Sequence, residues 1–238
     1  MKIDWLKVKK ILYIGIPSGI QSSLFSFSNV LIQSSINSFG DTVVAGSSAS
    51  SNIEAFMYVS MNAVYHVALT FIGQNVGARK FKNIRRLTLY SALIVSAVGI
   101  GSAILLTVFR YPLLHLYIDS PEAIEAALLR FSIIVPTYFL CGLMEVFCGG
   151  LRALDRSVTA MIISLAGACG LRILWIETVF KLYPSPQTIF ISYPVTWVVT
   201  AACHLLFMIL AARKLLREDR IAKQEENRII TSSLSYAY

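Results

Sequence analysis

The sequence has few charged residues for its length. Asp, Glu, Lys and Arg make up 14% of the 238 residues, whereas hydrophobic residues make up 56%. Soluble domains carry about 25% charged residues, so this composition argues against a soluble enzyme and excludes a disordered chain or a coiled coil. The charges lie between apolar stretches of about 20 residues or more, enough to cross a bilayer core of about 30 Å. The sequence therefore predicts an all-α membrane protein.

The sequence also lacks the motifs of common enzymes and metal sites. Its four cysteines lie inside apolar segments, without a C-x-x-C pair or a histidine at ligand spacing, so we interpret them as buried packing residues. There is no GxxxxGK loop, no HExxH and no G-x-S-x-G turn. We predict no enzymatic activity, no metal and no cofactor. Any transport would be driven by an ion gradient, because no ATP-binding domain is recognised.

Six apolar segments divide the chain into a polytopic bundle. Residues 1–10 form a basic lead-in, residues 11–212 form the six-helix transmembrane region, and residues 213–238 form a charged tail predicted to be partly disordered. The predicted spans cover residues 11–36, 45–76, 87–109, 126–151, 157–180 and 188–212.

The basic residues follow the topology that six spans require. A net charge of +8 could indicate a nucleic-acid partner, but these residues lie in short runs beside apolar segments, which excludes that reading. With the N-terminus inside, all but four of the 21 lie on the cytoplasmic side; the exceptions are Arg110, Arg130, Arg172 and Lys181. We predict a multi-pass protein of the cell membrane with both termini cytoplasmic.

A polar stripe runs along the second span at intervals of four residues, which places its members on one helical face. A carboxylate in the bilayer is costly, so Glu54 can bind a coupling cation on a transport pathway, or form a structural ion pair, for which Arg172 is the predicted partner. The stripe residues are Glu54, Tyr58, Asn62 and His66.

The first span carries a second polar stripe, without charge. Its side chains can solvate a cation or polar substrate, or hold helices together through hydrogen bonds. The stripe residues are Ser22, Ser26, Asn29, Gln33 and Asn37. Across both spans, we predict a substrate cavity that includes Gln21, Asn29, Gln33, Tyr58, Asn62, His66 and Arg172.

Glu145 in the fourth span is the second candidate for cation coupling. It lies about a turn and a half from the cytoplasmic boundary and precedes the small pair Gly149 and Gly150. The carboxylate can accept a proton or cap a buried polar network. In the same span, Pro136 can form either a gating hinge or a static bend.

Several segments resemble the multidrug and toxic compound extrusion (MATE) family, and specifically the second of its two six-helix lobes. The G-Q-N-x-G-A-R pattern that ends at Arg79 is the most specific. The matching segments are residues 15–21 (GIPSGIQ), 52–56 (NIEAF), 70–79 (TFIGQNVGAR), 150–152 (GLR) and 193–197 (YPVTW).

This resemblance implies a proton- or sodium-coupled antiporter that exports cationic drugs or other xenobiotics by alternating access between two lobes. The chain departs from the family in having six helices where the family has twelve. It also has no acidic residue between Asp4 and Asp41, where many members have one in the first helix of this lobe. Glu54 and Glu145 are therefore the remaining coupling candidates. The partner would be a missing N-terminal lobe or a second copy of the chain.

Two other functions remain open. The chain can be a flippase for lipid-linked precursors of the same superfamily, which would favour a large basic cavity; the presence of only Arg130 and Arg172 within spans argues against this. It can also be a truncated membrane remnant, or an assembly partner, that transports nothing.

Overall fold

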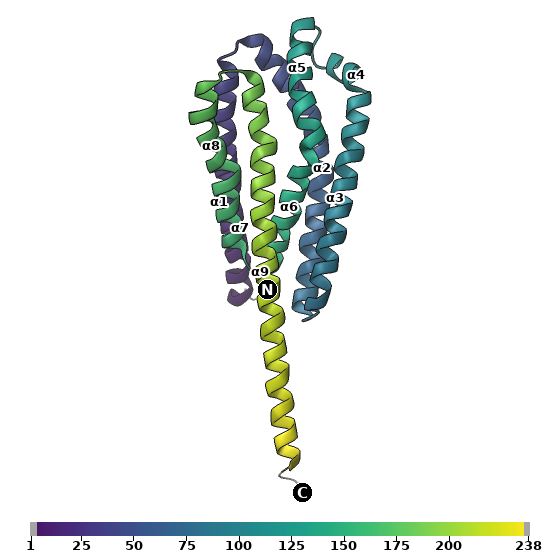
Figure 1. Cartoon of the computed structure of the whole chain (residues 1–238), viewed down its shortest axis with the longest axis vertical. Coiled ribbons are helices and arrows are strands. Elements are labelled where there is room, and N and C mark those ends of the chain that lie inside the picture. The colour runs from purple at the N-terminus through teal and green to yellow at the C-terminus, as the bar shows by residue number, and fades with distance from the viewer. Residues whose placement is uncertain (1–3, 236–238) are drawn as a thin grey trace.

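The computed structural model describes residues 4–235, with side chains for residues 4–6, 8–9 and 11–225, and this part consists of helices and turns (Figure 1). The helices are α1 (Trp5–Asn37), α2 (Asp41–Gly77), η1 (Phe81–Asn83), α3 (Ile84–Val108), α4 (Arg110–His115), α5 (Pro121–Ile134), η2 (Val135–Thr137), α6 (Tyr138–Ala153), α7 (Ser157–Ser164), η3 (Leu165–Gly170), α8 (Leu171–Trp175), η4 (Ile176–Phe180) and α9 (Pro186–Ser235).

Five stretches of helix in the described residues are long and apolar enough to cross a membrane, which confirms the all-α polytopic class. These are Asp41–Gly77, Phe81–Val108, Pro121–Ala153, Ser157–Phe180 and Pro186–Glu225. A sixth long helix, α1, has 33 residues and extends for about 50 Å. The polar side chains of α1 lower its mean hydropathy, so composition alone does not place it with the other five.

Close packing around α2 organises one side of the bundle. The buried residues Ile53, Met57 and Met61 recur every four positions, on the side of α2 that packs against α3, α5 and α6. Gly46 brings α2 against α5: a Cβ at this position would lie 2.3 Å from the backbone oxygen of Ala123. Without a hydrophobic driving force between helices in lipid, such close backbone approach supplies much of the packing energy.

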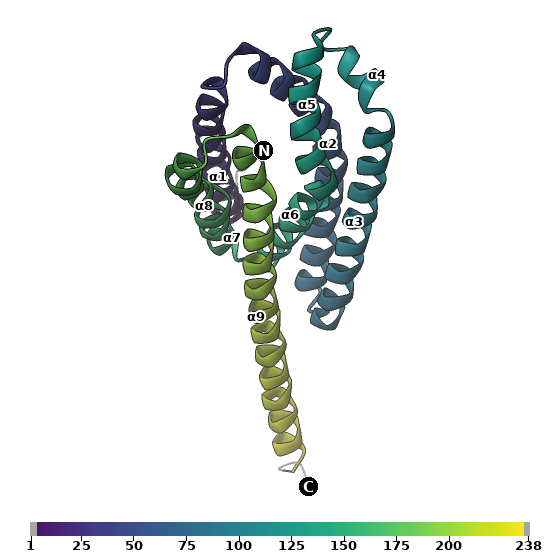
Figure 2. The same cartoon turned by 45° about the horizontal axis from the view of Figure 1, so that its top comes forward.

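The other side of the bundle is formed by α1, which packs against α7 and η3, while α9 packs against α6. Gly40, with a positive φ of 89°, forms the turn from which α1 and α2 diverge (Figure 2). Helix α9 leaves the bundle and continues through Ser235, across much of the predicted tail (Figure 1). Residues 236–238 of that tail lie outside the described residues.

Two spans are interrupted. Pro136 cannot donate a backbone hydrogen bond, and the chain tightens there into the 3₁₀ turn η2 between α5 and α6. The Thr137 hydroxyl donates to the carbonyl oxygens of Ile133 (2.8 Å) and Ile134 (3.0 Å), which satisfies polar groups at the break. In the next span, the π-helical segments η3 and η4 flank α8.

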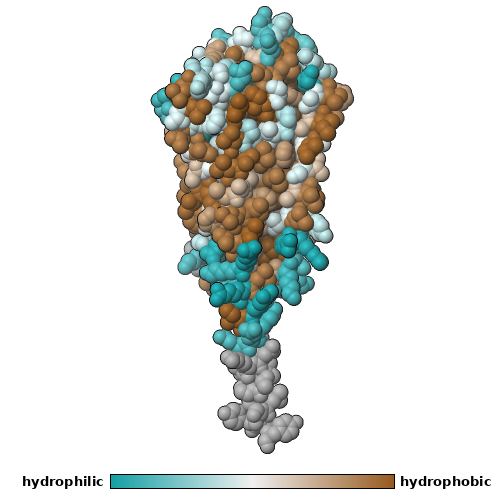
Figure 3. All heavy atoms as spheres, in the orientation of Figure 1, coloured by the Kyte–Doolittle hydropathy of each residue, from teal (hydrophilic) through white to brown (hydrophobic). Residues whose placement is uncertain are grey.

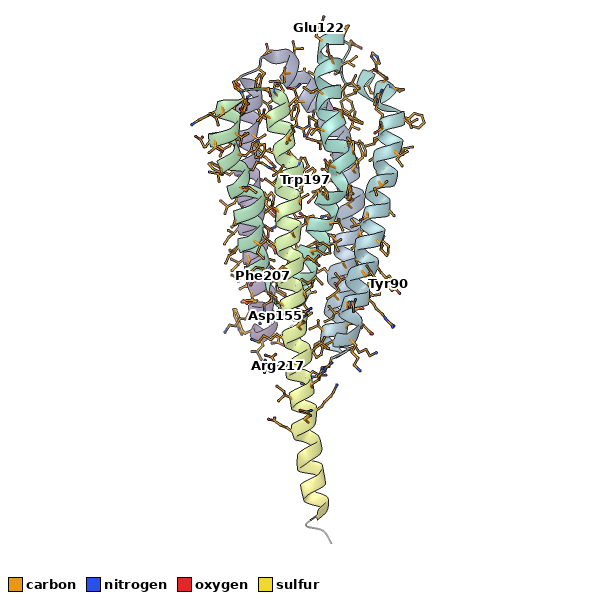
Figure 4. The ribbon with its side chains drawn as sticks, viewed as in Figure 1. Tyr90, Glu122, Asp155, Trp197, Phe207 and Arg217 are labelled. Atoms are coloured by element: carbon orange, nitrogen blue, oxygen red, sulfur yellow. The ribbon has the colours of Figure 1, made fainter. Side chains whose placement is uncertain are left out.

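The surface shows the band that a membrane requires. Hydrophobic residues cover the middle of the bundle and hydrophilic residues cover both of its ends (Figure 3). Glu122 in the first turn of α5 and Asp155 in the turn after α6 mark these opposite ends (Figure 4). The predicted fourth span therefore crosses the whole band in spite of its break.

Candidate functional site

One face of α6 carries polar residues that lie near α1 and α2. Glu145 and Arg152 lie on this face, about two turns apart. Arg152 Nη1 donates to Tyr65 Oη on α2 (2.6 Å), and Arg152 Nη2 donates to Gln21 Oε1 on α1 (2.8 Å). Arg152 therefore connects the two helices that carry the polar stripes.

Glu145 is half-buried in the same region. Its carboxylate forms no hydrogen bond or ion pair with any side chain that the structure describes. Arg152 and Tyr58 are its electrostatic neighbours. One turn further along α6, Gly149 leaves room for the Tyr65 ring, which would lie 2.9 Å from an added Cβ. A carboxylate placed in this way can take up a proton or attract a cation without first breaking an ion pair.

The polar stripe of α2 changes its environment along the helix. Glu54 is buried, Tyr58 is 42% exposed, Asn62 is half-buried and His66 is exposed. The His66 and Tyr65 rings lie at 71° to each other, with 4.9 Å between their centroids. Three of the four stripe residues are thus accessible, and the fourth is sealed in the interior.

The other described helices do not cover the polar stripe of α1. Asn29, Gln33 and Asn37 are all exposed, and Gln33 Nε2 donates to Asn37 Oδ1 within the helix (3.0 Å). None of these three side chains hydrogen-bonds to another helix in the described part of the chain. Within this chain, the stripe does not hold helices together.

Glu54 forms a buried ion pair with Arg130 of α5. Arg130 Nε donates to Glu54 Oε1 (2.9 Å) and Nη2 donates to Oε2 (2.7 Å), while Nη1 donates to Ser47 Oγ (3.1 Å). Ser50 Oγ donates to Glu54 Oε1 (2.9 Å), and the two charged residues are only 4% and 6% exposed. Two-point contact of this kind is strong and geometrically specific.

The ion-pair alternative for Glu54 is therefore realised, but the predicted partner was wrong. Arg130, and not Arg172, faces Glu54, because α5 packs directly on α2 while Arg172 points toward α9. The sequence did contain a signal: Arg130 lies inside a span, and an arginine there requires a counter-ion or other polar partners.

Arg172 lies in a separate environment on α8. It is 3% exposed, its guanidinium lies 4.2 Å from the centroid of the Tyr193 ring, and Nη2 donates to Thr196 Oγ1 (3.3 Å). Its Nε has no hydrogen-bond partner, and no described carboxylate pairs with it, since Glu177 pairs with Lys181. A cavity of about 210 Å³ between α1 and the α8–η4 segment has Arg172 in its lining.

A family model described as MatE matches residues 17–176. The chain belongs to the MatE family. The probable multidrug resistance protein YoeA of Bacillus subtilis (strain 168) is 20% identical over 202 residues, which make up 84% of this chain and 43% of YoeA. The FAD transporter of Shewanella oneidensis is 22% identical over 69% of this chain and 36% of that protein.

Solved MATE structures share the fold. The crystal structure of a MATE protein in complex with MaL6 matches with a TM-score of 0.82, at 14% identity, over 91% of this chain and 49% of that chain. The chain thus spans half or less of the length of these relatives, as one MATE lobe would. MATE family members are transporters and not enzymes, and their names support membrane transport and multidrug efflux at the family level.

Within the MatE lobe, sequence reasoning missed the residues that hold the site together. Arg152 belongs to a segment that resembles the family, but its position at the end of a span indicated only a cytoplasmic charge. Tyr65 lies beside the α2 stripe and not in it. Their contact joins residues 87 positions apart, and the contact of Arg152 with Gln21 joins residues 131 positions apart, so periodicity could not reveal either contact.

Proposed function

We propose that this chain is one lobe of a secondary active antiporter that exports cationic organic compounds in exchange for protons or sodium ions. The observation that carries the proposal is the arrangement of Glu145, Tyr58 and Arg152 at α1 and α2, two helices whose polar stripes the described chain leaves accessible except at Glu54. Polar side chains are costly against hydrocarbon, so these stripes require a water-filled vestibule or a second lobe.

Glu145 is the proposed coupling residue. Its carboxylate has no ion-pair partner among the described side chains, whereas Glu54 is held at both oxygens by Arg130. The Tyr58 ring, together with the amides of Asn29, Gln33 and Asn62, offers the cation–π and polar contacts that a cationic aromatic compound needs. Glu54 is the alternative coupling residue, and Gln21 and His66 complete the proposed cavity.

The proposed cycle requires a partner, which is an N-terminal lobe or a second copy of this chain. Alternating access arises when one lobe rocks against another around a central site. The proposed setting is the cell membrane with both termini cytoplasmic, in agreement with the basic residues at one end of the bundle.

Transport by the reconstituted chain tests the proposal. Proteoliposomes that contain the full chain are loaded with a cationic dye, and its efflux is recorded under an imposed proton or sodium gradient. We expect Glu145→Gln to abolish gradient-driven efflux, and Glu177→Gln, which alters an exposed carboxylate paired with Lys181, to leave it unchanged. Gradient-independent efflux by the parent protein, or parental efflux by both Glu145→Gln and Glu54→Gln, would contradict the proposal.

Arg172 supports a second candidate, the transport of an anionic compound. A buried guanidinium that has no carboxylate partner among the described residues, and that lines a cavity, is suited to a phosphate or carboxylate group. The named activity of the Shewanella oneidensis relative is transport of FAD, which is anionic. Flavin nucleotide transport in the same vesicles, lost in Arg172→Gln and retained in Glu145→Gln, would favour this candidate over cation export.

A further inference from the structure

A basic cavity lies at the end of the bundle from which α9 emerges. It has a volume of about 660 Å³ and is enclosed by two segments distant in sequence, the turn between α2 and α3 and the extension of α9. The turn contributes Arg79, Lys80, Phe81, Lys82 and Asn83, and the extension contributes Leu216, Asp219, Arg220 and Lys223.

The wall of this cavity on the α2–α3 side is held in a defined conformation. Arg79 has a positive φ of 53°, which is uncommon for a residue other than glycine, and the Lys80 backbone N–H donates to the Asn75 carbonyl oxygen (2.8 Å). Asn83 Nδ2 donates to Asn75 Oδ1 (2.9 Å), and Asn75 Nδ2 donates to the Phe71 carbonyl oxygen (2.9 Å). These bonds hold the backbone of the turn that carries the basic residues opposite α9.

The charge in the lining is strongly unbalanced. Five lining residues are basic and one is acidic, and this carboxylate, Asp219, already pairs with Lys223 (2.8 Å). Among the described side chains, the remaining basic residues of the lining form no ion pair; they are Arg79, Lys80, Lys82 and Arg220. An anion that binds among these basic side chains relieves their mutual repulsion, and phosphate accepts several such donors at once.

The cavity lies at the depth of lipid headgroups. On α9, the exposed apolar residues Phe207 and Leu210 end the hydrophobic band, and the basic extension begins with Arg213. Figure 3 shows the hydrophilic belt directly beside that band, and Figure 4 places Phe207 within the bundle and Arg217 beyond it. Phe81 and Leu216 in the lining add apolar surface beside the basic groups. A ligand with both a phosphate and an apolar portion fits this composition.

We propose that this cavity binds the phosphate headgroup of an anionic membrane lipid, which joins the α2–α3 turn to the α9 extension. Basic pockets beside membrane-spanning helices at the cytoplasmic interface recognise such headgroups through charge and hydrogen bonds. This inference is independent of the transported substrate. It concerns lipid recognition at the end of the lobe and not the face between α1 and α2.

Lipid binding to the purified full chain tests the inference. Native mass spectrometry and thermal unfolding in detergent are recorded with cardiolipin or phosphatidylglycerol, with zwitterionic phosphatidylcholine, and with soluble glycerol phosphate. We expect the anionic lipids to bind and to raise the Tm of the parent, and phosphatidylcholine and glycerol phosphate to have no effect. An equal stabilisation by glycerol phosphate would assign the cavity to a free phosphate compound and overturn the lipid proposal.

Matched variants separate the cavity from the general basic surface. The variant Lys80→Gln/Lys82→Gln/Arg220→Gln should weaken cardiolipin binding by roughly a hundredfold, since each basic residue near an anionic surface contributes about fivefold. The control Arg213→Gln/Lys214→Gln/Arg217→Gln removes the same charge outside the lining and should bind nearly as the parent. Lys82→Gln alone removes an exposed side chain that forms no hydrogen bond with a described residue, so the variant should fold and still weaken binding. Equal losses in the two triple variants would overturn the inference.

Discussion

Arg130 donates hydrogen bonds to both carboxylate oxygens of Glu54, from Nε to Oε1 at 2.9 Å and from Nη2 to Oε2 at 2.7 Å. The two residues are 76 positions apart in the sequence. The pair joins α5 to α2 inside the bundle, and the Phe190 and Tyr193 rings lie 5.6 and 5.5 Å from the guanidinium. In this position the charge of Glu54 is already matched. The main role of the pair is therefore to stabilise the lobe.

Breaking this pair should destabilise the lobe. Either Glu54→Gln or Arg130→Gln leaves the other charge buried without its counter-ion, which costs about 3–5 kcal/mol of unfolding free energy. Thermal unfolding of each purified variant in detergent measures the loss.

The double variant Glu54→Gln/Arg130→Gln provides the control for this prediction. It removes both charges together, so it should regain much of the stability that either single change loses, and the cycle gives the coupling energy of the pair. A Glu54→Gln variant as stable as the parent but unable to transport would instead place Glu54 in the coupling mechanism.

Arg152 should anchor α1 to the remainder of the lobe. In Arg152→Gln, the geometry that satisfies Tyr65 and Gln21 is lost, and we expect a lower Tm together with faster hydrogen exchange in α1. Tyr65→Phe removes one of the two bonds and should cost about 0.6–2 kcal/mol, the usual range for a hydrogen bond between membrane helices.

Arg156→Gln is the matched control for Arg152. Arg156 is exposed in the following turn, and its side chain forms no hydrogen bond with a described residue, so its replacement should leave both measurements at the parental value. If α1 exchanged at the same rate in Arg152→Gln and in the parent, the anchoring role would be wrong.

Two glycine substitutions should change stability in opposite directions. At Gly46 an added Cβ meets the backbone of α5 at 2.3 Å from Ala123 O and 2.7 Å from Ala127 N, so Gly46→Ala must separate α2 from α5, at a cost of about 1–3 kcal/mol. Gly101 on α3 has nothing within 4 Å, and Gly101→Ala should gain up to about 1 kcal/mol from helix propensity. Their Tm values give the comparison; a shift of the same sign in both variants would contradict the close crossing of α2 and α5.

Labelling with a water-soluble maleimide should distinguish the polar stripes from the lipid-facing surface. In a background with the four native cysteines replaced by alanine, Asn29→Cys on α1 should react, because its face is expected to meet water. Ile104→Cys on α3, which is 61% exposed in the apolar band, should stay unlabelled because lipid covers it. Equal protection of the two positions in membranes would remove the vestibule from the proposed mechanism.

Several features were predictable because they depend on local composition. The run of apolar residues between clustered charges determines where helices cross the bilayer, and each predicted span lies within one observed helix or run of consecutive helices, except that the third extends one residue past α3 to Phe109. The break at Pro136 was likewise predictable, because proline removes a backbone donor whatever its surroundings. The stripe on α1 followed from helical spacing alone, since residues three and four apart share a face.

The pairing of the polar groups was decided only by the tertiary structure. Helical periodicity states which residues share a face, but it carries no information about what that face meets. Arg172 was the predicted partner for the case in which Glu54 forms a structural ion pair, yet close packing of α2 on α5 at Gly46 brings Arg130 to Glu54 instead. The divergence of α1 and α2 similarly decides that Arg152 connects the two helices while Glu145 stays unpaired among the described side chains. These contacts depend on how helix backbones approach one another in three dimensions, which the composition of any single helix does not determine.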